Sequence, residues 1–226
     1  MNILLTNDDG YDSVGINLVK NKLLKYGRVV VVAPKKMMSA KSVAITVGVS
    51  VEVKKVEEDV YYLDGTPADC VAFGLSSLGI KFDLVVSGCN NGLNISYDIM
   101  YSGTVGACLQ ALTFRVPAIA FSQEGDFKIV DKHFDEVMDY IQNNKLLSLD
   151  YLLNVNFPVS ENALGIEMTS IFYRERVTYY EKRGENMYYA LRQIDDEHCQ
   201  EVGSDAYAVY HQKISITKIA KTSDLI

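Results

Sequence analysis

Ile3-Leu4-Leu5-Thr6-Asn7-Asp8-Asp9-Gly10 decides the fold of this chain, because its apolar run is typical of a buried strand and ends directly in two carboxylates. In α/β domains, ligands bind at the carboxyl edge of the parallel strands, where such polar residues lie. Neighbouring strand residues point to opposite faces, so Asp8 and Asp9 can converge on one ligand only if the chain turns between them. Gly10 makes that turn feasible.

The segments that follow alternate between helix and strand patterns. Residues 16–26 carry apolar side chains at helical spacing, Gly27 is predicted to end that helix in a left-handed cap, and 29–33 is a β-branched run typical of a strand buried on both faces. Further strands are predicted at 83–88, 116–122 and 152–157, further helices at 67–78, 105–112 and 130–141, and an edge hairpin at 47–56 and 60–63. This order predicts an α/β fold whose core contains a mostly parallel sheet.

The carboxy-terminal part has a different character. Residues 173–196 are crowded with tyrosine and charge, which predicts an extended hairpin used in oligomer contacts, because amphipathic aromatic residues are frequent at interfaces. A short helix at 205–210 and a strand at 214–219 follow. We predict one domain over 1–226, with an α/β core at 1–157 and a β-rich oligomerisation excursion, hairpin and tail, at 158–226.

Composition excludes several classes of protein. The 226 residues are 48% hydrophobic and 23% charged, as in a globular protein, and the net charge of −7 gives no basic surface for duplex nucleic acid or an anionic membrane. No apolar run reaches the roughly 18 to 20 residues of a membrane span, and no targeting peptide is recognised.

Four cysteines, Cys70, Cys89, Cys108 and Cys199, lack CxxC spacing, so we interpret them as buried free thiols in a reducing cytoplasm. The three histidines are interpreted as structural or surface residues: His133, His198 and His211.

The polar residues at the predicted strand ends form a set of hard oxygen ligands without His or Cys. They are Asp8, Asp9, Ser39, Asn90, Asn94, Ser102 and Thr104. Such a set favours Mg²⁺, Mn²⁺ or Ca²⁺ over zinc or copper. Each motif alone is typical of a solvated turn or a helix cap, and only their coincidence at several strand ends indicates a site. The loop after the first strand is not GxGxxG, so dinucleotide binding has no support.

The loop Ser102-Gly103-Thr104 precedes a predicted helix and offers hydroxyls, backbone N–H groups and the positive end of a helix dipole, which together suit phosphate. A divalent ion beside a phosphate site predicts phosphoester hydrolysis, in which the metal polarises the phosphoryl group and lowers the pKa of a bound water. Asp8 or Asp9 would act as the base for that water or as an aspartyl nucleophile, and the sequence leaves both open.

Five motifs in order resemble the survival protein E (SurE) family of 5′/3′-nucleotidases. They are residues 3–10, Val32-Ala33-Pro34 followed by Ser39 and Thr46, Gly65-Thr66-Pro67-Ala68-Asp69-Cys70-Val71, Ser87-Gly88-Cys89-Asn90-Asn91-Gly92-Leu93-Asn94, and Tyr101-Ser102-Gly103-Thr104-Val105. Residues 154–158, Asp205 and 215–217 extend the resemblance over nearly the whole chain.

This resemblance implies a Rossmann-like three-layer core and a cytoplasmic, metal-dependent phosphatase of nucleoside 5′-monophosphates, with 3′-monophosphates and short polyphosphate as further candidate substrates. It implies one Mg²⁺ or Mn²⁺ per subunit, with Ca²⁺ as a substitute in crystals, and a homodimer or homotetramer formed through the carboxy-terminal region. By resemblance, the metal ligands are Asp8, Asp9, Ser39 and Asn90, and the phosphate contacts are Asn94, Ser102, Gly103 and Thr104.

The sequence departs from the family pattern in a few places. Ala40 follows the metal-site serine where the family usually has glycine, and it would strain the loop if that position needs a positive φ. Cys89 replaces the common isoleucine. Near the end, Gln212, Lys213 and Lys218 replace glycine, tyrosine and proline, so tail packing or exchange is expected to differ.

Three other classes of protein share parts of this pattern. A haloacid-dehalogenase-type phosphatase needs two aspartates separated by one residue, and here they are adjacent. A receiver-like signalling domain needs a phosphoaccepting Asp at the end of a central strand, whereas Asp83 begins its strand. A non-catalytic nucleotide-binding member of the family would keep every residue named above.

Overall fold

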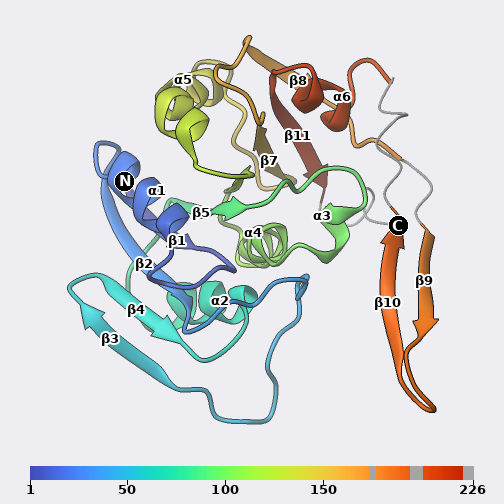
Figure 1. Ribbon diagram of the computed structural model, residues 1–226. Coiled ribbons are helices and arrows are strands. Elements are labelled where there is room, and N and C mark those ends of the chain that lie inside the picture. Colours follow the sequence, from blue (N-terminus) through green and yellow to red (C-terminus); the bar gives the residue numbers. More distant parts are fainter. Residues whose placement is uncertain (174–176, 194–200, 221–226) are drawn as a thin grey trace.

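A nine-stranded sheet forms the centre of the protein in a computed structural model that describes residues 1–173, 177–193 and 201–220 (Figure 1). The strands of this sheet are β1 (Asn2–Thr6), β2 (Arg28–Pro34), β3 (Val53–Glu57), β4 (Val60–Leu63), β5 (Leu84–Asn91), β6 (Ala118–Gln123), β7 (Tyr151–Phe157), β8 (Ile166–Thr169) and β11 (Ile214–Ala220). Two further strands, β9 (Val177–Lys182) and β10 (Tyr188–Gln193), pair with each other. The helices are α1 (Val14–Leu23), α2 (Pro67–Ser77), α3 (Asp98–Tyr101), α4 (Gly103–Thr113), α5 (Lys128–Asn143) and α6 (Asp205–Tyr210).

The strand order of the large sheet is β3-β4-β2-β1-β5-β6-β7-β11-β8. From β4 to β7 every neighbouring pair is parallel, whereas β3 is antiparallel to β4 and β11 is antiparallel to β7. Strands β2 and β4, which follow β1 in the sequence, lie on one side of β1, and β5, β6 and β7 extend the sheet on its other side. This is the doubly wound Rossmann-like order, and its switch point lies between β1 and β5, where such sheets bind ligands. The predicted α/β fold is confirmed.

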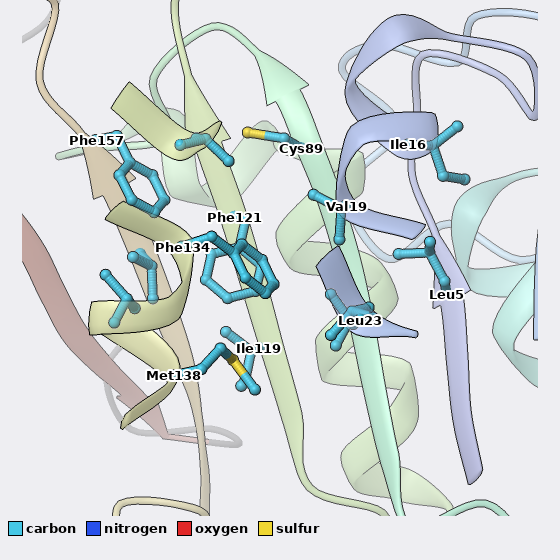
Figure 2. Close-up of a cluster of buried hydrophobic side chains, with 14 of the residues drawn as sticks. Leu5, Ile16, Val19, Leu23, Cys89, Ile119, Phe121, Phe134, Met138 and Phe157 are labelled. Carbon is cyan, nitrogen blue, oxygen red and sulfur yellow. The ribbon is translucent and has the colours of Figure 1, made fainter. Parts of the chain in front are cut away.

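Helices cover both faces of the sheet, which gives three layers (Figure 1). On one face, α1 and α5 pack against strand residues such as Leu5 and Phe121 (Figure 2). On the other face, α2 and α4 pack against Leu4 and its neighbours. Leu4 and Leu5 belong to opposite cores because successive strand side chains alternate between faces. The apolar run of β1 is therefore buried on both faces of the sheet.

Two local predictions were wrong. Helix α1 ends at Leu23, and Gly27 is not its cap. A Cβ on Gly27 would lie 2.0 Å from the carbonyl oxygen of Met1, so close backbone packing explains this glycine. The strand predicted from 47 begins only at Val53, because its antiparallel partner β4 offers just the four residues Val60–Leu63. Residues 35–52 are instead a long loop without a helix or strand.

The carboxy-terminal strands divide into two groups. β11 and β8 extend the main sheet, and β11 is inserted between β7 and β8. β9 and β10 form a separate antiparallel hairpin at the side of the molecule (Figure 1). The predicted hairpin is confirmed over the residues that are described, and 174–176 and 194–196 lie outside them.

The thiols of Cys70, Cys89 and Cys108 are free and buried as predicted, and burial raises the pKa of each. His198 and Cys199 lie outside the described residues. In the part of the chain that the structure describes, no helix is both long and apolar enough for a membrane crossing.

Candidate functional site

The turn after β1 is held by Asn7, a fully buried residue. Its amide nitrogen donates to Gly10 O at 3.0 Å and to Ser13 Oγ at 2.7 Å, and its Oδ1 accepts from Gly10 N at 3.2 Å. Gly10 has φ +113°, a conformation that favours glycine. The turn predicted at Gly10 is therefore present, and both Asp8 and Asp9 line one pocket.

Asp8 is the buried member of the carboxylate pair. Its Oδ1 accepts a hydrogen bond of 2.6 Å from the Thr104 hydroxyl. Burial raises the pKa of Asp8 to about 6, although the Thr104 hydrogen bond opposes that rise, and the neighbouring charge of Asp9 adds to it. Asp9 is more accessible, and its Oδ2 accepts from Asn91 N at 3.1 Å. A buried carboxylate next to a second one is an environment that a bound cation would stabilise.

The loop that carries Ser39 is fixed against the carboxylate turn and α4. Met38 N donates to Asp8 O at 2.7 Å, and Ser42 N donates to Tyr101 O at 3.0 Å. At the second contact the chain passes so close to α4 that a Cβ on Gly106 would lie 2.0 Å from Ser42 O. The loop thereby brings Ser39 to the same pocket as Asp8 and Asp9.

The amino-terminal end of α2 holds the other part of this loop. Asp69 Oδ1 accepts from Thr46 N at 2.8 Å, and Asp69 Oδ2 accepts from the Thr46 hydroxyl at 2.6 Å and from Thr66 N at 2.9 Å. The Thr66 hydroxyl accepts from Asp69 N and donates to Ala44 O. Thr66 is the N-cap of α2, and its capping box with Asp69 is shared with the loop. The Gly65–Cys70 motif therefore starts α2 and supports the loop of Ser39.

The end of β5 supplies Asn90 and Asn94. The Asn90 amide nitrogen donates to Gly92 O at 2.8 Å, which orients that side chain within its loop. Asn94 is almost completely buried, and its Nδ2 donates to Ser122 Oγ at 2.8 Å. Both asparagines line the pocket. Asp83 lies at the opposite, amino-terminal edge of β5, where it accepts from Asn2 N at 2.7 Å, so a receiver-like aspartate is not at this site.

The amino-terminal end of α4 closes the pocket. Ser102 is the N-cap, its Oγ accepts from Val105 N at 3.1 Å, and it lines the pocket. Gly103 and Thr104 lie behind Asp8. A Cβ on Gly103 would lie 3.0 Å from Asp8 Cβ. The Thr104 hydroxyl donates its hydrogen bond to the Asp8 carboxylate. The structure therefore brings Ser102 to the pocket, and it places the other two predicted phosphate residues against a carboxylate.

The pocket has a volume of about 250 Å³ and collects six of the eight predicted residues. They are Asp8, Asp9, Ser39, Asn90, Asn94 and Ser102. Met37, Leu93 and Tyr101 line it too, together with Asp98. It lies at the switch point between β1 and β5, beside the amino-terminal end of an eleven-residue helix.

The donor chemistry fits a hard divalent cation. The four predicted ligands bring two carboxylates, a hydroxyl and an amide oxygen to one pocket. Over the described ranges 1–173, 177–193 and 201–220, no three His, Cys, Asp or Glu side chains gather in a way that could hold a metal ion. A cation at this pocket would therefore use neutral oxygens in addition to Asp8 and Asp9.

Sequence reasoning missed the residues that support the pocket from a distance. The close approach at Gly106 and the buried asparagines of β7 that contact Asn94 link segments far apart in the chain. The paired asparagines in Asn154-Val155-Asn156 were the one available signal, because polar residues are unusual inside a buried strand.

Comparisons with known proteins agree with one another. Residues 3–178 match the family model described as "Survival protein SurE". The chain is 34% identical to "5'-nucleotidase SurE" of Clostridium botulinum (strain Loch Maree / Type A3), with 97% of this chain and 92% of the relative covered. It is 37% identical to the protein of the same name from Aquifex aeolicus (strain VF5), with 96% and 90% covered.

A solved structure is similar as well. The crystal structure of the "Sure Protein from Aquifex aeolicus" superposes with a TM-score of 0.83 at 35% identity, covering 98% of this chain and 94% of that one.

Proposed function

Because this chain belongs to the survival protein SurE family, we propose that it is a divalent-metal-dependent phosphoric monoester hydrolase that converts nucleoside 5′-monophosphates to nucleoside and phosphate. The observation that carries the proposal is the pocket at the β1–β5 switch point, which joins two carboxylates to the amino-terminal end of α4. Curated relatives of this chain are named 5′-nucleotidases.

In this proposal, Asp8, Asp9, Ser39 and Asn90 hold one Mg²⁺ or Mn²⁺ per subunit. The cation would supply positive charge that stabilises the phosphoryl group during transfer. Asn94 and Ser102 face the same pocket and would bind the phosphoryl oxygens, supported by the dipole of α4. Gly103 allows α4 to approach Asp8 closely, and the Thr104 hydroxyl fixes the orientation of the Asp8 carboxylate by donating to its Oδ1.

The two carboxylates have different surroundings, which supports different roles. Asp8 is buried and its Oδ1 is occupied by Thr104, so it suits a fixed ligand. Asp9 is more accessible, and its Oδ2 accepts a longer backbone hydrogen bond from Asn91, so it is better placed to accept a proton.

The remaining lining of the pocket suits a nucleoside. Met37, Leu93 and Tyr101 add apolar surface beside the polar set. Nucleosides combine an apolar base face with polar edges, so such a mixed lining fits them better than it fits a bare phosphate. The 3′-monophosphates and short polyphosphate remain further candidate substrates. The free thiols of Cys70, Cys89 and Cys108 support a reducing, cytoplasmic location.

The test is phosphate release from 5′- and 3′-nucleoside monophosphates and polyphosphate, with Mg²⁺, Mn²⁺ or EDTA. Replacing Asp9→Asn or Asp9→Ala should lower kcat/KM by at least roughly a hundredfold, because a direct ligand is lost. Asp12→Asn is the matched control, since Asp12 lies exposed three residues further along the chain, and it should behave like wild type.

Turnover that survives EDTA or the Asp9 substitutions would contradict the site assignment. Binding of Mn²⁺ and nucleotide without any turnover would instead favour the non-catalytic nucleotide-binding alternative.

A further inference from the structure

Asn94 is enclosed by a buried network of side chains from β6 and β7. Asn156 Oδ1 accepts from Asn94 N at 2.8 Å, and Asn156 Nδ2 donates to Asn94 O at 3.0 Å. Asn154 Nδ2 donates to the same carbonyl oxygen at 2.7 Å. The Asn94 side chain donates to Ser122 Oγ at 2.8 Å. The exposed fraction is 5% for Asn94 and zero for the other three, so these four hydrogen bonds are shielded from water.

The register of the sheet explains why these side chains meet. Ser122 of β6 is the parallel partner of Asn156 of β7, so both point to the same face. Asn154 lies two residues earlier in β7 and shares that face. On that face β7 begins with Leu152, which belongs to the core beneath α4, and then changes to amide side chains toward its carboxyl end. The change occurs at the end of β7 that contacts Asn94, a residue that lines the pocket.

The network fixes the orientation of Asn156. Its oxygen faces the N–H of Asn94 and its nitrogen faces the C=O of the same residue, so a flipped amide would oppose donor to donor and acceptor to acceptor. The pair of bonds holds the peptide groups on both sides of the Asn94 Cα. The Ser122 contact then fixes the side chain, so both the position and the rotamer of Asn94 are set from β6 and β7.

A second anchor holds the same loop two residues later. Asp205, at the start of α6, accepts from Ser96 N at 2.9 Å through its Oδ2. Its Oδ1 accepts from Phe172 N at 2.9 Å. The loop that follows β5 is therefore tied at Asn94 to β7 and at Ser96 to α6. Both anchors lie more than fifty residues further along the chain.

We propose that Asn156, with Asn154 and Ser122, is a positioning residue that holds the Asn94 side chain where it binds the phosphoryl group. This inference rests on the proposed function only for the identity of the substrate. It predicts that these residues control phosphate affinity and not cation affinity, because their side-chain hydrogen bonds in the described residues go to Asn94. Ser122 is the neighbour of Asn90 in the sheet, but that pairing runs through the backbone, which a substitution of the Ser122 hydroxyl keeps.

The test compares Asn156→Asp and Ser122→Ala with the control Val155→Ala in the full-length protein. Asn156→Asp keeps the shape of the side chain but turns a carboxylate oxygen toward Asn94 O. Ser122→Ala removes one hydroxyl and gives a second variant that buries no charge. Val155 lies between the two asparagines on the opposite face of β7, in the other core, so Val155→Ala reports loss of packing alone.

Binding of inorganic phosphate in the presence of Mn²⁺ is measured by titration calorimetry, together with Mn²⁺ affinity and thermal unfolding. We expect phosphate affinity to fall about tenfold in Asn156→Asp and Ser122→Ala, which corresponds to roughly 1.4 kcal/mol, with Mn²⁺ affinity unchanged. Val155→Ala should lose stability and keep phosphate affinity. In the Asn94→Ala background, adding Asn156→Asp should cost no further phosphate affinity, since its effect acts through Asn94.

The inference would be overturned if Asn156→Asp and Ser122→Ala both bound phosphate as tightly as Val155→Ala does. It would also be overturned if Asn156→Asp lowered phosphate affinity as much in the Asn94→Ala background as it does alone. The readout does not depend on turnover. A wild type that binds phosphate but hydrolyses no nucleotide would count against the proposed function, and the role of Asn156 would still be decided.

Discussion

Ala40 occupies a left-handed conformation, with φ +58°, directly after Ser39. An L residue in this region costs about 1–2 kcal/mol, because its Cβ crowds the following carbonyl group. The strain expected from the sequence at this position is thus present. It lies in the loop that brings Ser39 to the pocket, so it opposes the conformation that the site uses.

Replacing Ala40→Gly should therefore raise the free energy of unfolding by roughly 1 kcal/mol or somewhat less, since the relief of strain is partly offset by the greater freedom of glycine in the unfolded chain. Urea unfolding measures this change. Ala44→Gly is the matched control, because Ala44 lies in the same loop outside the left-handed region and should lose stability. Equal destabilisation of both variants would show that the loop relaxes around residue 40.

Asp205 is a buried carboxylate whose pKa is raised by burial and lowered by backbone hydrogen bonds. Burial raises its pKa above the ordinary 3.8, although backbone N–H groups of Ser96, Phe172 and Ala206 donate to it. A raised pKa means that the folded protein binds this proton more tightly than the unfolded chain does. Stability from this group is therefore fully present below pH 3.8 and is lost as the pH rises through the folded-state pKa.

We expect Asp205→Asn to destabilise the protein by about 1–3 kcal/mol, because its amide nitrogen must face a backbone donor. The deficit relative to wild type should shrink as the pH rises above 3.8, since only the wild type loses stability by ionising in that range. Urea unfolding of both proteins at several pH values measures it. A deficit that grows with pH would mean that the three hydrogen bonds outweigh burial.

At the scale of elements, the loop 35–52 and helix α4 are fitted to each other at Gly106. A glycine inside a helix is unfavourable by about 1 kcal/mol relative to alanine, so its presence there needs a reason in packing. The reason is the carbonyl group of Ser42, which lies where a side chain would begin.

Gly106→Ala should keep the helix but push the loop away from α4. Mn²⁺ affinity and nucleotide turnover should then fall, about tenfold or more, while far-ultraviolet circular dichroism stays unchanged. Gly184→Ala is a suitable control, because a Cβ there would meet only the Met187 side chain at an ordinary 3.5 Å. Wild-type Mn²⁺ affinity in Gly106→Ala would show that the loop adapts without moving Ser39.

Elements were predictable where their signal is local. The strands that end at Thr6 and Pro34 have continuous apolar runs, and α2 has Thr66 and Pro67 at its start. The short α3 and β8 have no such period and were missed. The pocket residues were predictable because parallel strands end at one edge. The contacts of Gly106 and Asn156 were not, since nothing in a local pattern encodes which distant segment a side chain meets.

At the scale of the whole molecule, the β9–β10 hairpin presents aromatic residues to solvent. Tyr180, Tyr188 and Tyr189 are each more than half exposed, and Met187 lies beside them. Tyr180 and Tyr188 share one face of the hairpin, as their register with Ala190 and Lys182 shows. Exposed tyrosines on a two-stranded ribbon support the predicted role in a homo-oligomer.

Replacing Tyr180→Ser together with Tyr188→Ser should lower the mass measured by sedimentation velocity, because apolar contact area between subunits is lost. Val14→Ser is the control, since Val14 is an exposed apolar residue on α1 and should leave the mass unchanged. A hairpin variant with the mass of the wild type at all concentrations would remove the hairpin from the interface.

The position of β11 has a consequence for synthesis. β11 lies inside the sheet, yet it is the last described strand to leave the ribosome, after both of its neighbours β7 and β8. Until it arrives, a nascent chain presents the open hydrogen-bonding edge of β7, and β8 has no strand to join. Open edges of this kind attract strands from other chains. Translation that pauses before Ile214 would thus leave this protein in need of a chaperone.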